Sequence, residues 1–256
     1  LINKSSLNID VDSFKETRPF PHVVINDFFN ADVALEASKS FPEYNDEKWH
    51  VYSNSLEDKK TINNWNLFSE IQYKIFAELN SRPFVDFLET LVGDKLYADN
   101  GLHGGGLHIH SSNGNLNPHL DYSIHPKLGL QRKLNIIVYL ETEFKDEYGG
   151  HLGLWSTEKK NKHGSLAHEV SPIFNRAVIF DTTKNSWHGM SRNLNLPHGK
   201  YRKSFAVYYM QNPEENYDPR SRALFSPRES QKGDTDVLEL IKIRADEKRH
   251  SDAYRK

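Results

Sequence analysis

The chain has 256 residues, with 33 Lys and Arg against 35 Asp and Glu, 13 histidines and no cysteine. The net charge of -2 gives no basis for nucleic-acid binding, and the absence of cysteine excludes disulfides, zinc–thiolate sites, iron–sulfur clusters and cysteine nucleophiles. Ten of the histidines lie between residues 101 and 200. Because the chain has no thiols, any transition-metal site must be built from imidazole and carboxylate.

The first 95 residues read as mostly helical. Residues 1–20 are polar and are expected to be irregular, and the proline-rich segment 19–25 predicts a short strand. Apolar side chains at helical spacing predict three amphipathic helices, over 31–41, 67–79 and 83–92. In the third helix Leu88 and Leu91 share a face, and Gly93 follows at the position of a C-cap glycine.

The second half of the chain has a different pattern, of short strands between turn signals. Strands are predicted over 107–110, 119–122, 134–140, 152–155, 177–181 and 204–210. This pattern indicates a sandwich or barrel and not an alternating parallel sheet. We expect a mainly β protein with flanking helices (α+β).

We expect residues 1–212 to form a single domain. Its helical part covers about 19–95 and its β core about 101–212. Residues 213–256 form a charged C-terminal extension, in which 235–249 is compatible with one exposed helix.

The sharpest local feature is the tripeptide His119-Leu120-Asp121. On a strand, His119 and Asp121 point to the same face, and together they offer two ligands of a 2-His-1-carboxylate triad, the arrangement associated with non-haem Fe(II). Such a tripeptide also arises by chance, so a surface pair is the alternative.

Two further features follow downstream. His188 comes after the apolar strand predicted over 177–181, and Arg202 and Ser204 share a strand face. A guanidinium and a hydroxyl aimed at one point suit a carboxylate. Taken singly, His188 also fits an ordinary loop histidine, and Arg202 an ordinary cation at the start of a strand.

The order and spacing of these residues resemble the Fe(II)/2-oxoglutarate-dependent oxygenases, within them the prolyl-4-hydroxylase-like branch. Sixty-six residues separate Asp121 from His188, and Arg202 follows fourteen residues after His188. Supporting similarity lies in segments 19–24, 132–140, 149–152 and 172–180. The resemblance covers residues 19–212, with its specific part in 101–210.

This resemblance implies a double-stranded β-helix (a jelly-roll or cupin-like core) with the N-terminal helices packed on one sheet. It implies that His119, Asp121 and His188 bind the iron. Arg202 would bind the distal carboxylate of 2-oxoglutarate with Ser204, and Tyr139 matches a tyrosine that reaches the same carboxylate. The implied reaction is hydroxylation of an unactivated C–H bond with Fe(II), 2-oxoglutarate and O2, giving succinate and CO2, with ascorbate as a stimulant.

Some histidines depart from the family pattern. The family often has a tyrosine facing the other end of the cosubstrate, near ten residues before the first ligand. Here His110 stands closest, with His108 on the same strand face. Either His110 takes the role of that tyrosine, or both histidines support the site from behind or lie at the surface. His151, after a Gly-Gly turn, is expected to point into the substrate cavity or to solvent. Exposed structural positions are expected for His125, His163, His168, His198 and His250.

Two other classes compete with an oxygenase. One is a non-catalytic cupin-type barrel that binds a metabolite or sugar, but it needs no Arg202–Ser204 pair. The other is a zinc-dependent hydrolase, but it leaves Arg202 and Tyr139 without a role and has no evident glutamate base.

The substrate class stays broad. A small molecule, an amino acid or a peptidyl residue such as proline fits, and the oligomeric state is not indicated. Its specificity is expected in loops around the barrel mouth, at 49–54, 101–106, 125–130 and 155–168. No nucleic-acid or membrane partner is expected, and the cysteine-free composition fits a cytoplasmic location.

Overall fold

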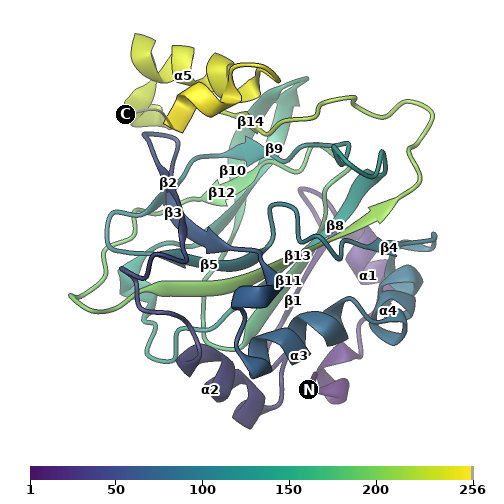
Figure 1. Ribbon diagram of the computed structural model, residues 1–256. Helices are drawn as coiled ribbons and strands as arrows, with labels where there is room; N and C mark the ends of the chain where they lie inside the picture. Colours follow the sequence, from purple (N-terminus) through teal and green to yellow (C-terminus); the bar gives the residue numbers. More distant parts are fainter. Residues whose placement is uncertain (255–256) are drawn as a thin grey trace.

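The computed structural model describes residues 1–254 as two antiparallel β-sheets with helices on one of them. The larger sheet has the order β1 (His22–Ile25), β11 (Arg176–Asp181), β8 (Gln131–Tyr139), β13 (Arg202–Gln211), β5 (Gly106–His110), β3 (Glu57–Ile62) and β2 (His50–Ser53), with β4 (Tyr97–Ala98) on β13 and β6 (Asn115–Leu116) on β3. The smaller sheet has the order β10 (Lys162–Val170), β9 (Leu152–Lys159), β12 (His188–Met190), β7 (His119–Leu120) and β14 (Leu224–Phe225). The strands that alternate between the two sheets form the expected β-helix (Figure 1).

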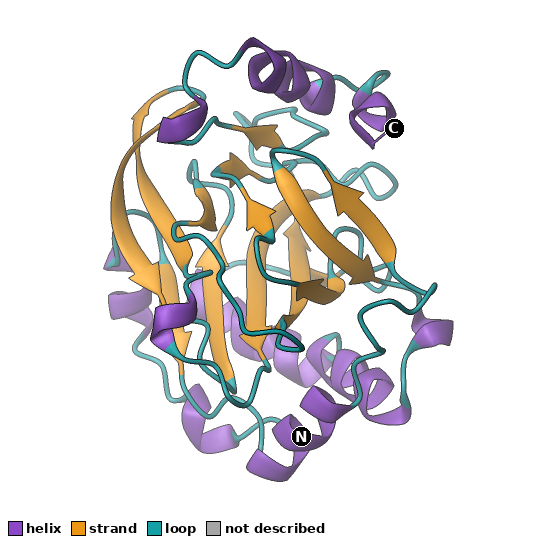
Figure 2. Ribbon diagram, turned by 90° about the vertical axis from the view of Figure 1, so that its left-hand side faces the viewer, coloured by secondary structure: helices purple, strands orange, loops and turns teal. Residues whose placement is uncertain are grey.

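The N-terminal helices gather on one side of the larger sheet (Figure 2). They are α1 (Val11–Glu16), α2 (Ala31–Lys39), α3 (Glu70–Leu79) and α4 (Arg82–Val92), with short 3-10 turns η1 (Lys4–Leu7) and η2 (Trp65–Leu67). A further 3-10 turn, η3 (Asp146–Tyr148), precedes β9. All three predicted helices are present, and Gly93 ends α4 in the left-handed conformation, with φ 77°. Helix α3 begins three residues later than predicted, because Ser69 and Gln72 form a capping box.

The main core lies between these helices and the outward face of the larger sheet. Side chains alternate along β13, so Phe205, Val207 and Tyr209 face the helices. Phe205 packs against Phe76 of α3 with ring centroids 5.1 Å apart, and the Tyr209 hydroxyl donates to the Leu79 carbonyl at 2.7 Å. The opposite face of β13 is left free to line the space between the sheets.

Two predictions for the first half of the chain are wrong. Residues 4–7 and 11–16, predicted to be irregular, form η1 and α1, where the Asp10 carboxylate caps the short helix α1. Residues 50–62, in the part read as mostly helical, form the hairpin β2–β3 at the edge of the larger sheet. The hairpin carries polar residues on its inward face, so its period of two lacks the apolar signal of a half-buried strand.

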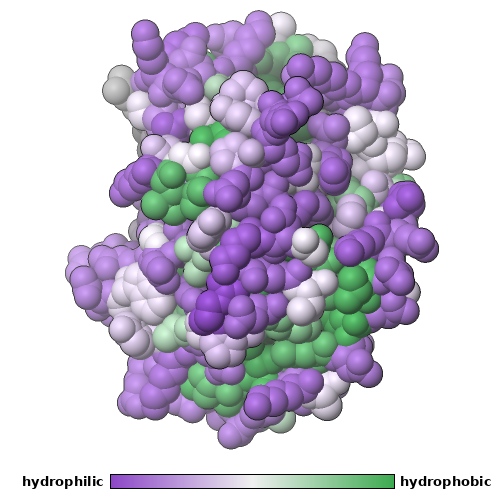
Figure 3. Space-filling view, turned by 90° about the vertical axis from the view of Figure 1, so that its right-hand side faces the viewer, coloured by the Kyte–Doolittle hydropathy of each residue, from purple (hydrophilic) through white to green (hydrophobic). Residues whose placement is uncertain are grey.

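The C-terminal residues pack on the barrel at the end away from the N-terminal helices (Figure 1). They form β14, η4 (Glu229–Gln231), α5 (Thr235–Ala245) and η5 (His250–Tyr254). Phe225 and Val237 share a small core with Leu56, which precedes β3. The face seen in Figure 3 is hydrophilic over much of its upper half, with apolar residues gathered in its lower half. Within residues 1–254, no helix is long and apolar enough to cross a membrane.

Candidate metal and cosubstrate site

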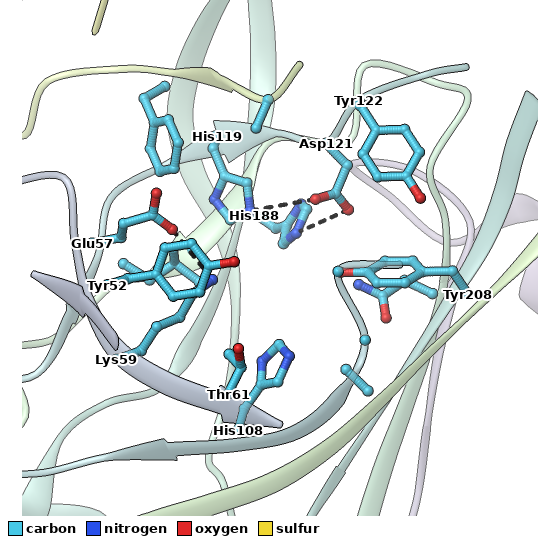
Figure 4. A pocket seen from close by; sticks show the side chains of 18 of the residues that line it. Tyr52, Glu57, Lys59, Thr61, His108, His119, Asp121, Tyr122, His188 and Tyr208 are labelled. Carbon is cyan, nitrogen blue, oxygen red and sulfur yellow. Dashed lines mark ion pairs between the residues drawn. The ribbon is translucent and has the colours of Figure 1, made fainter. Parts of the chain in front are cut away.

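The inward faces of the two sheets enclose a cavity of about 550 Å³. Alternation along the strands of the larger sheet places these residues on its wall: Glu57, Lys59 and Thr61 of β3, His108 and His110 of β5, and Arg202, Ser204, Ala206 and Tyr208 of β13. His119 of β7 and His188 of β12 enter from the smaller sheet (Figure 4). The predicted residues from distant parts of the sequence therefore meet in one space.

His119, Asp121 and His188 form a compact cluster in this cavity. His119 and His188 are paired neighbours on β7 and β12, and Asp121 follows directly after β7. The Nε2 atoms of both histidines lie 3.7 Å from the Asp121 carboxylate, as the dashed lines in Figure 4 show. One ligand atom from each of the three residues falls within 4.8 Å of the others. This geometry can hold a single metal ion.

Backbone carbonyls orient the two imidazoles. Nδ1 of His119 lies 2.9 Å from the Asn117 carbonyl oxygen, and Nδ1 of His188 lies 2.8 Å from that of Ser186. A carbonyl only accepts, so each Nδ1 carries the proton and each Nε2 presents a lone pair to the cluster. Burial, and to a smaller extent the neighbouring His119 ring, lowers the pKa of His188 to about 4. Its imidazole is therefore neutral at pH 7. Neutral imidazole is the form that binds metals.

Arg132 holds the third member of the cluster. Its guanidinium lies 3.1 Å from the Asp121 carboxylate and is sandwiched between the rings of Tyr122 and Tyr208, 3.6 and 3.4 Å from their centroids. Burial alone would raise the pKa of Asp121, but the charge of Arg132 and the interactions with His188 and His119 together outweigh it, so the pKa is lowered. Two imidazoles and one ionised carboxylate are the donor set of the Fe(II) facial triad.

Arg202 is buried in the same cavity without a carboxylate partner among residues 1–254. Its Nε donates to the Gly150 carbonyl at 2.8 Å, and its Nη2 donates to the Tyr139 hydroxyl at 3.3 Å. Ser204 pairs across the sheet with Tyr139 on one side and with His108 on the other. A buried cation with only neutral acceptors is costly unless an anion joins it. The arrangement can therefore bind a carboxylate.

The other histidines considered in the sequence lie in different surroundings. His110 lines the cavity beside its cross-strand partner Arg202, and both its ring nitrogens lack a hydrogen-bond partner in the described chain. Burial first, then the charge of Arg202, lowers its pKa. The expectation for His151 is wrong, because it is buried outside the cavity lining, with Nε2 2.7 Å from Asp146. The exposed position expected for His125 is also wrong, since this side chain is buried beside Asp99.

The mouth of the cavity differs from the predicted loops. His50, Tyr52 and residues 103–105 line it, but residues 125–130 and 155–168 do not, and residues 162–170 form strand β10. The C-terminal segment supplies lining residues that the sequence did not indicate: Ser221, Arg222, Ala223, Phe225, Arg244, Ser251 and Tyr254. Their only sequence signal is the charged, aromatic-containing stretch after residue 213, which does not say where it packs. The exposed position expected for His250 is wrong, because this side chain is half-buried and also lines the cavity.

Sequence and structure comparisons agree with this geometry. Residues 105–211 match the model of the 2OG-Fe(II) oxygenase superfamily. A prolyl-4-hydroxylase from Pseudomonas putida has a TM-score of 0.56 at 12% identity, covering 80% of this chain and 97% of that one. A prolyl 4-hydroxylase from Phytophthora capsici has a TM-score of 0.56 at 16% identity, covering 99% and 83%. HygX from Streptomyces hygroscopicus, solved with nickel, 2-oxoglutarate and hygromycin B, has a TM-score of 0.50 at 13% identity, covering 82% and 88%.

The two sheets thus form a double-stranded β-helix that carries a His–Asp–His cluster able to hold a metal ion. Residues 105–211 are similar to the 2OG-Fe(II) oxygenase superfamily, and the fold of the chain is shared with the prolyl-4-hydroxylases. No curated protein matches the chain by sequence.

Proposed function

We propose that the protein is an Fe(II)- and 2-oxoglutarate-dependent dioxygenase that hydroxylates an unactivated C–H bond. The observation that carries this proposal is the shared cavity of the His–Asp–His cluster and Arg202. A metal ion held by these three residues would have room for a 2-oxo acid and O2, and Arg202 would offer a cation for the far carboxylate of the same acid. The matched family and the shared fold support the proposal.

Each residue has a stated role in this proposal. His119, Asp121 and His188 bind Fe(II), and Arg132 keeps the carboxylate of Asp121 ionised and in place. Arg202 binds the distal carboxylate of 2-oxoglutarate, with Ser204 beside it and Tyr139 fixing the guanidinium. His110 contacts the cosubstrate from the neighbouring strand. The bound iron, with 2-oxoglutarate and O2, supplies the oxidation that places one oxygen atom on the substrate and yields succinate and CO2.

The two competing classes fit the cavity less well. Apart from Asp121, Glu57 is the one carboxylate on the cavity wall in the described chain, and it is taken by Lys59 and Arg244 at 3.4 and 2.9 Å. A carboxylate held by two cations is a poor general base for a zinc hydrolase. A simple binding barrel leaves the buried Arg202 unexplained.

The substrate is a small molecule or a peptide. HygX was solved with hygromycin B, and a prolyl hydroxylase from Trichoplax adhaerens, with a TM-score of 0.53 at 14% identity, was solved with a peptide fragment. We therefore place amino acids, prolyl peptides and small metabolites in one panel.

The test is oxygen transfer in that panel. Purified protein with Fe(II), 2-oxoglutarate and ¹⁸O₂ is expected to form succinate and a product that gains one labelled oxygen, as measured by mass spectrometry. His188→Ala should abolish both, while His198→Ala, at an exposed position outside the cavity, should retain both. Cleavage of a panel compound by water without use of 2-oxoglutarate would instead support the hydrolase.

A further inference from the structure

The cavity carries more positive than negative charge. Five cationic side chains line it, against two carboxylates: Lys59, Arg132, Arg202, Arg222 and Arg244, against Glu57 and Asp121. A bound Fe(II) ion and the dianion 2-oxoglutarate carry equal and opposite charges, so loading the site leaves this imbalance in place. The loaded cavity therefore favours a further anion.

Arg222 is the cation that the proposed machinery does not use. Arg132 pairs with Asp121, Lys59 and Arg244 both pair with Glu57, and Arg202 is assigned to the cosubstrate. Arg222 has no ion pair within the described chain, and its Nε is buried without a hydrogen-bond partner. An ordinary surface arginine would have this nitrogen in water.

Neighbouring arginines on the same segment are engaged elsewhere. Arg220 binds Asp218 at 2.7 Å and donates to the Asp121 carbonyl at 3.1 Å. Arg228 donates to the side chains of Asn115 and Asn117. Both have structural partners, which sets Arg222 apart from them.

Backbone pairing places Arg222 alongside the metal cluster. Phe225 and Leu224 pair in register with His119 and Leu120. On the other side of Arg222, the Arg220 carbonyl accepts from the Ser123 amide at 2.7 Å. Residue 222 thus runs beside the stretch between Leu120 and Ser123, which contains Asp121.

The C-terminal segment also limits the size of what can enter. His250, Ser251 and Tyr254 of this segment form part of the cavity wall, opposite the N-terminal helices in the fold (Figure 1). The segment is tied to the β2–β3 hairpin, because the Tyr254 hydroxyl donates to Glu57 and the Tyr254 ring packs edge-on against Tyr52 at 5.3 Å. A cavity of about 550 Å³ with this wall matches a small ligand.

We propose that the primary substrate is a small molecule that carries a carboxylate or a phosphate, and that Arg222 binds this anion next to the metal cluster. This inference rests on the proposed function, since it names the substrate class of the same site. A guanidinium binds carboxylate and phosphate alike through two parallel hydrogen bonds.

The first test measures anion binding with the cosubstrate position filled. The protein is loaded with Zn(II) and N-oxalylglycine, an unreactive analogue of 2-oxoglutarate, and titrated by calorimetry with inorganic phosphate and, separately, with acetate. Saturable one-to-one binding of at least one anion is expected, with Arg222→Gln weakening it roughly ten- to hundredfold. Arg249→Gln removes the same charge from an exposed position of the same segment and should bind as the wild type does. The anion that binds with the higher affinity identifies the anionic group of the substrate as phosphate or carboxylate.

Other results overturn the inference in distinct ways. Absence of anion binding, or equal binding by wild type and Arg222→Gln, removes Arg222 from a substrate site. Loss of N-oxalylglycine affinity in Arg222→Gln would assign this arginine to the cosubstrate. Failure of the wild type to bind N-oxalylglycine contradicts the proposed function itself, so the two failures are distinguishable.

A second test uses paired compounds in the hydroxylation assay. Each carboxylate or phosphate is offered beside its neutral amide or its dephosphorylated form. Oxygen incorporation is expected for the anionic member, with a raised KM for it in Arg222→Gln. Preferred hydroxylation of the neutral member, or of a prolyl peptide with both ends blocked, would overturn the inference.

Discussion

Two backbone carbonyls set the direction in which His119 and His188 present their free nitrogens. The Asn117 carbonyl that orients His119 also lies against Gly189, the residue after His188. A Cβ at Gly189 would lie 2.6 Å from this oxygen, so any larger residue must displace it. The glycine is therefore part of the support of the cluster, although it binds no ligand.

This contact predicts a specific effect of Gly189→Ala. Displacement of the Asn117 carbonyl should tilt the His119 ring and weaken metal binding by roughly 10- to 100-fold, as is usual when an outer partner of a ligand is disturbed. Calorimetric titration with Ni(II) measures the affinity. Gly129→Ala is the control, since its Cβ meets nothing within 4 Å and only the backbone, at φ 65°, is strained. Equal metal affinities in the two variants would contradict the supporting role of Gly189.

Arg202 yields a second prediction. Arg202→Gln removes the charge-assisted bonds to the distal carboxylate, and it should raise the dissociation constant for 2-oxoglutarate roughly 30- to 150-fold, or about 2–3 kcal/mol. Metal affinity should change little, because the guanidinium contacts Gly150 and Tyr139 and none of the three cluster residues. Titration of the metal-loaded protein with 2-oxoglutarate separates the two effects. Wild-type cosubstrate affinity in this variant would remove Arg202 from the site.

Much of the candidate site was predictable from the resemblance to a known family, and not from the residues taken singly. His119, Asp121 and Arg202 were placed on strands and His188 in a turn after a strand, and the structure brings the four residues to one cavity. Arg222 was missed because its role depends on which strand it lies beside. A short pairing such as β14 with β7 leaves no periodic pattern in the sequence.

At the scale of elements, an ionic clasp joins the β2–β3 hairpin to the C-terminal helices. Glu57 is buried on β3, where it accepts from Arg244 of α5 at 2.9 Å and from Tyr254 of η5. Burial alone would raise the pKa of Glu57, but the charges of Lys59 and Arg244 and the hydroxyl of Tyr254 outweigh it and lower the pKa to about 2. The clasp depends on ionised Glu57.

The clasp predicts a pH-dependent part of the stability. A carboxyl with a lowered folded-state pKa stabilises the protein above its ordinary value of 4.5, and this contribution is lost as the pH falls from about 4.5 to 2. Glu57→Gln should therefore lower the free energy of unfolding at pH 7 by about 3 kcal/mol, and by less at pH 3. Urea unfolding at the two pH values measures the difference.

Glu239→Gln is the control for the clasp, because Glu239 forms only exposed ion pairs on α5. It should change stability little at either pH. If the loss of unfolding free energy in Glu57→Gln is as large at pH 3 as at pH 7, the clasp acts through shape and not through charge.

Elements with apolar periodicity were predicted well, and polar elements were not. The three helices and the buried strands such as β8 and β11 have the expected type and approximate bounds. Strands β3 and β10 were missed, since β3 carries polar residues into the cavity and β10 is largely exposed. In both, neighbouring strands decide the conformation, and single-sequence propensity is then a weak guide.

At the scale of the whole molecule, the cluster joins segments that are far apart in the chain. His119 and Asp121 lie around β7 and His188 on β12, so a bound metal ties the smaller sheet together. Ni(II) in about 100-fold excess over its dissociation constant should add about 2.7 kcal/mol to the stability and raise the melting temperature by roughly 5–10 °C.

Thermal unfolding with and without Ni(II) and a chelator checks this prediction. The chelator should reverse the shift, and His188→Ala should show no shift at all. His198→Ala should retain it, because His198 is exposed in a loop outside the cavity. Equal shifts in the two variants would place the stabilising metal elsewhere.

The central claim is that the His–Asp–His cluster and Arg202 jointly bind Fe(II) and 2-oxoglutarate. Its most direct measurement is the visible charge-transfer band of the Fe(II)–2-oxoglutarate chelate, recorded without oxygen as 2-oxoglutarate is titrated in. The band should appear in the wild type and in His198→Ala, be absent in His188→Ala, and require far more 2-oxoglutarate in Arg202→Gln. A wild-type protein without the band, or a His188→Ala variant with an unchanged one, would contradict the claim.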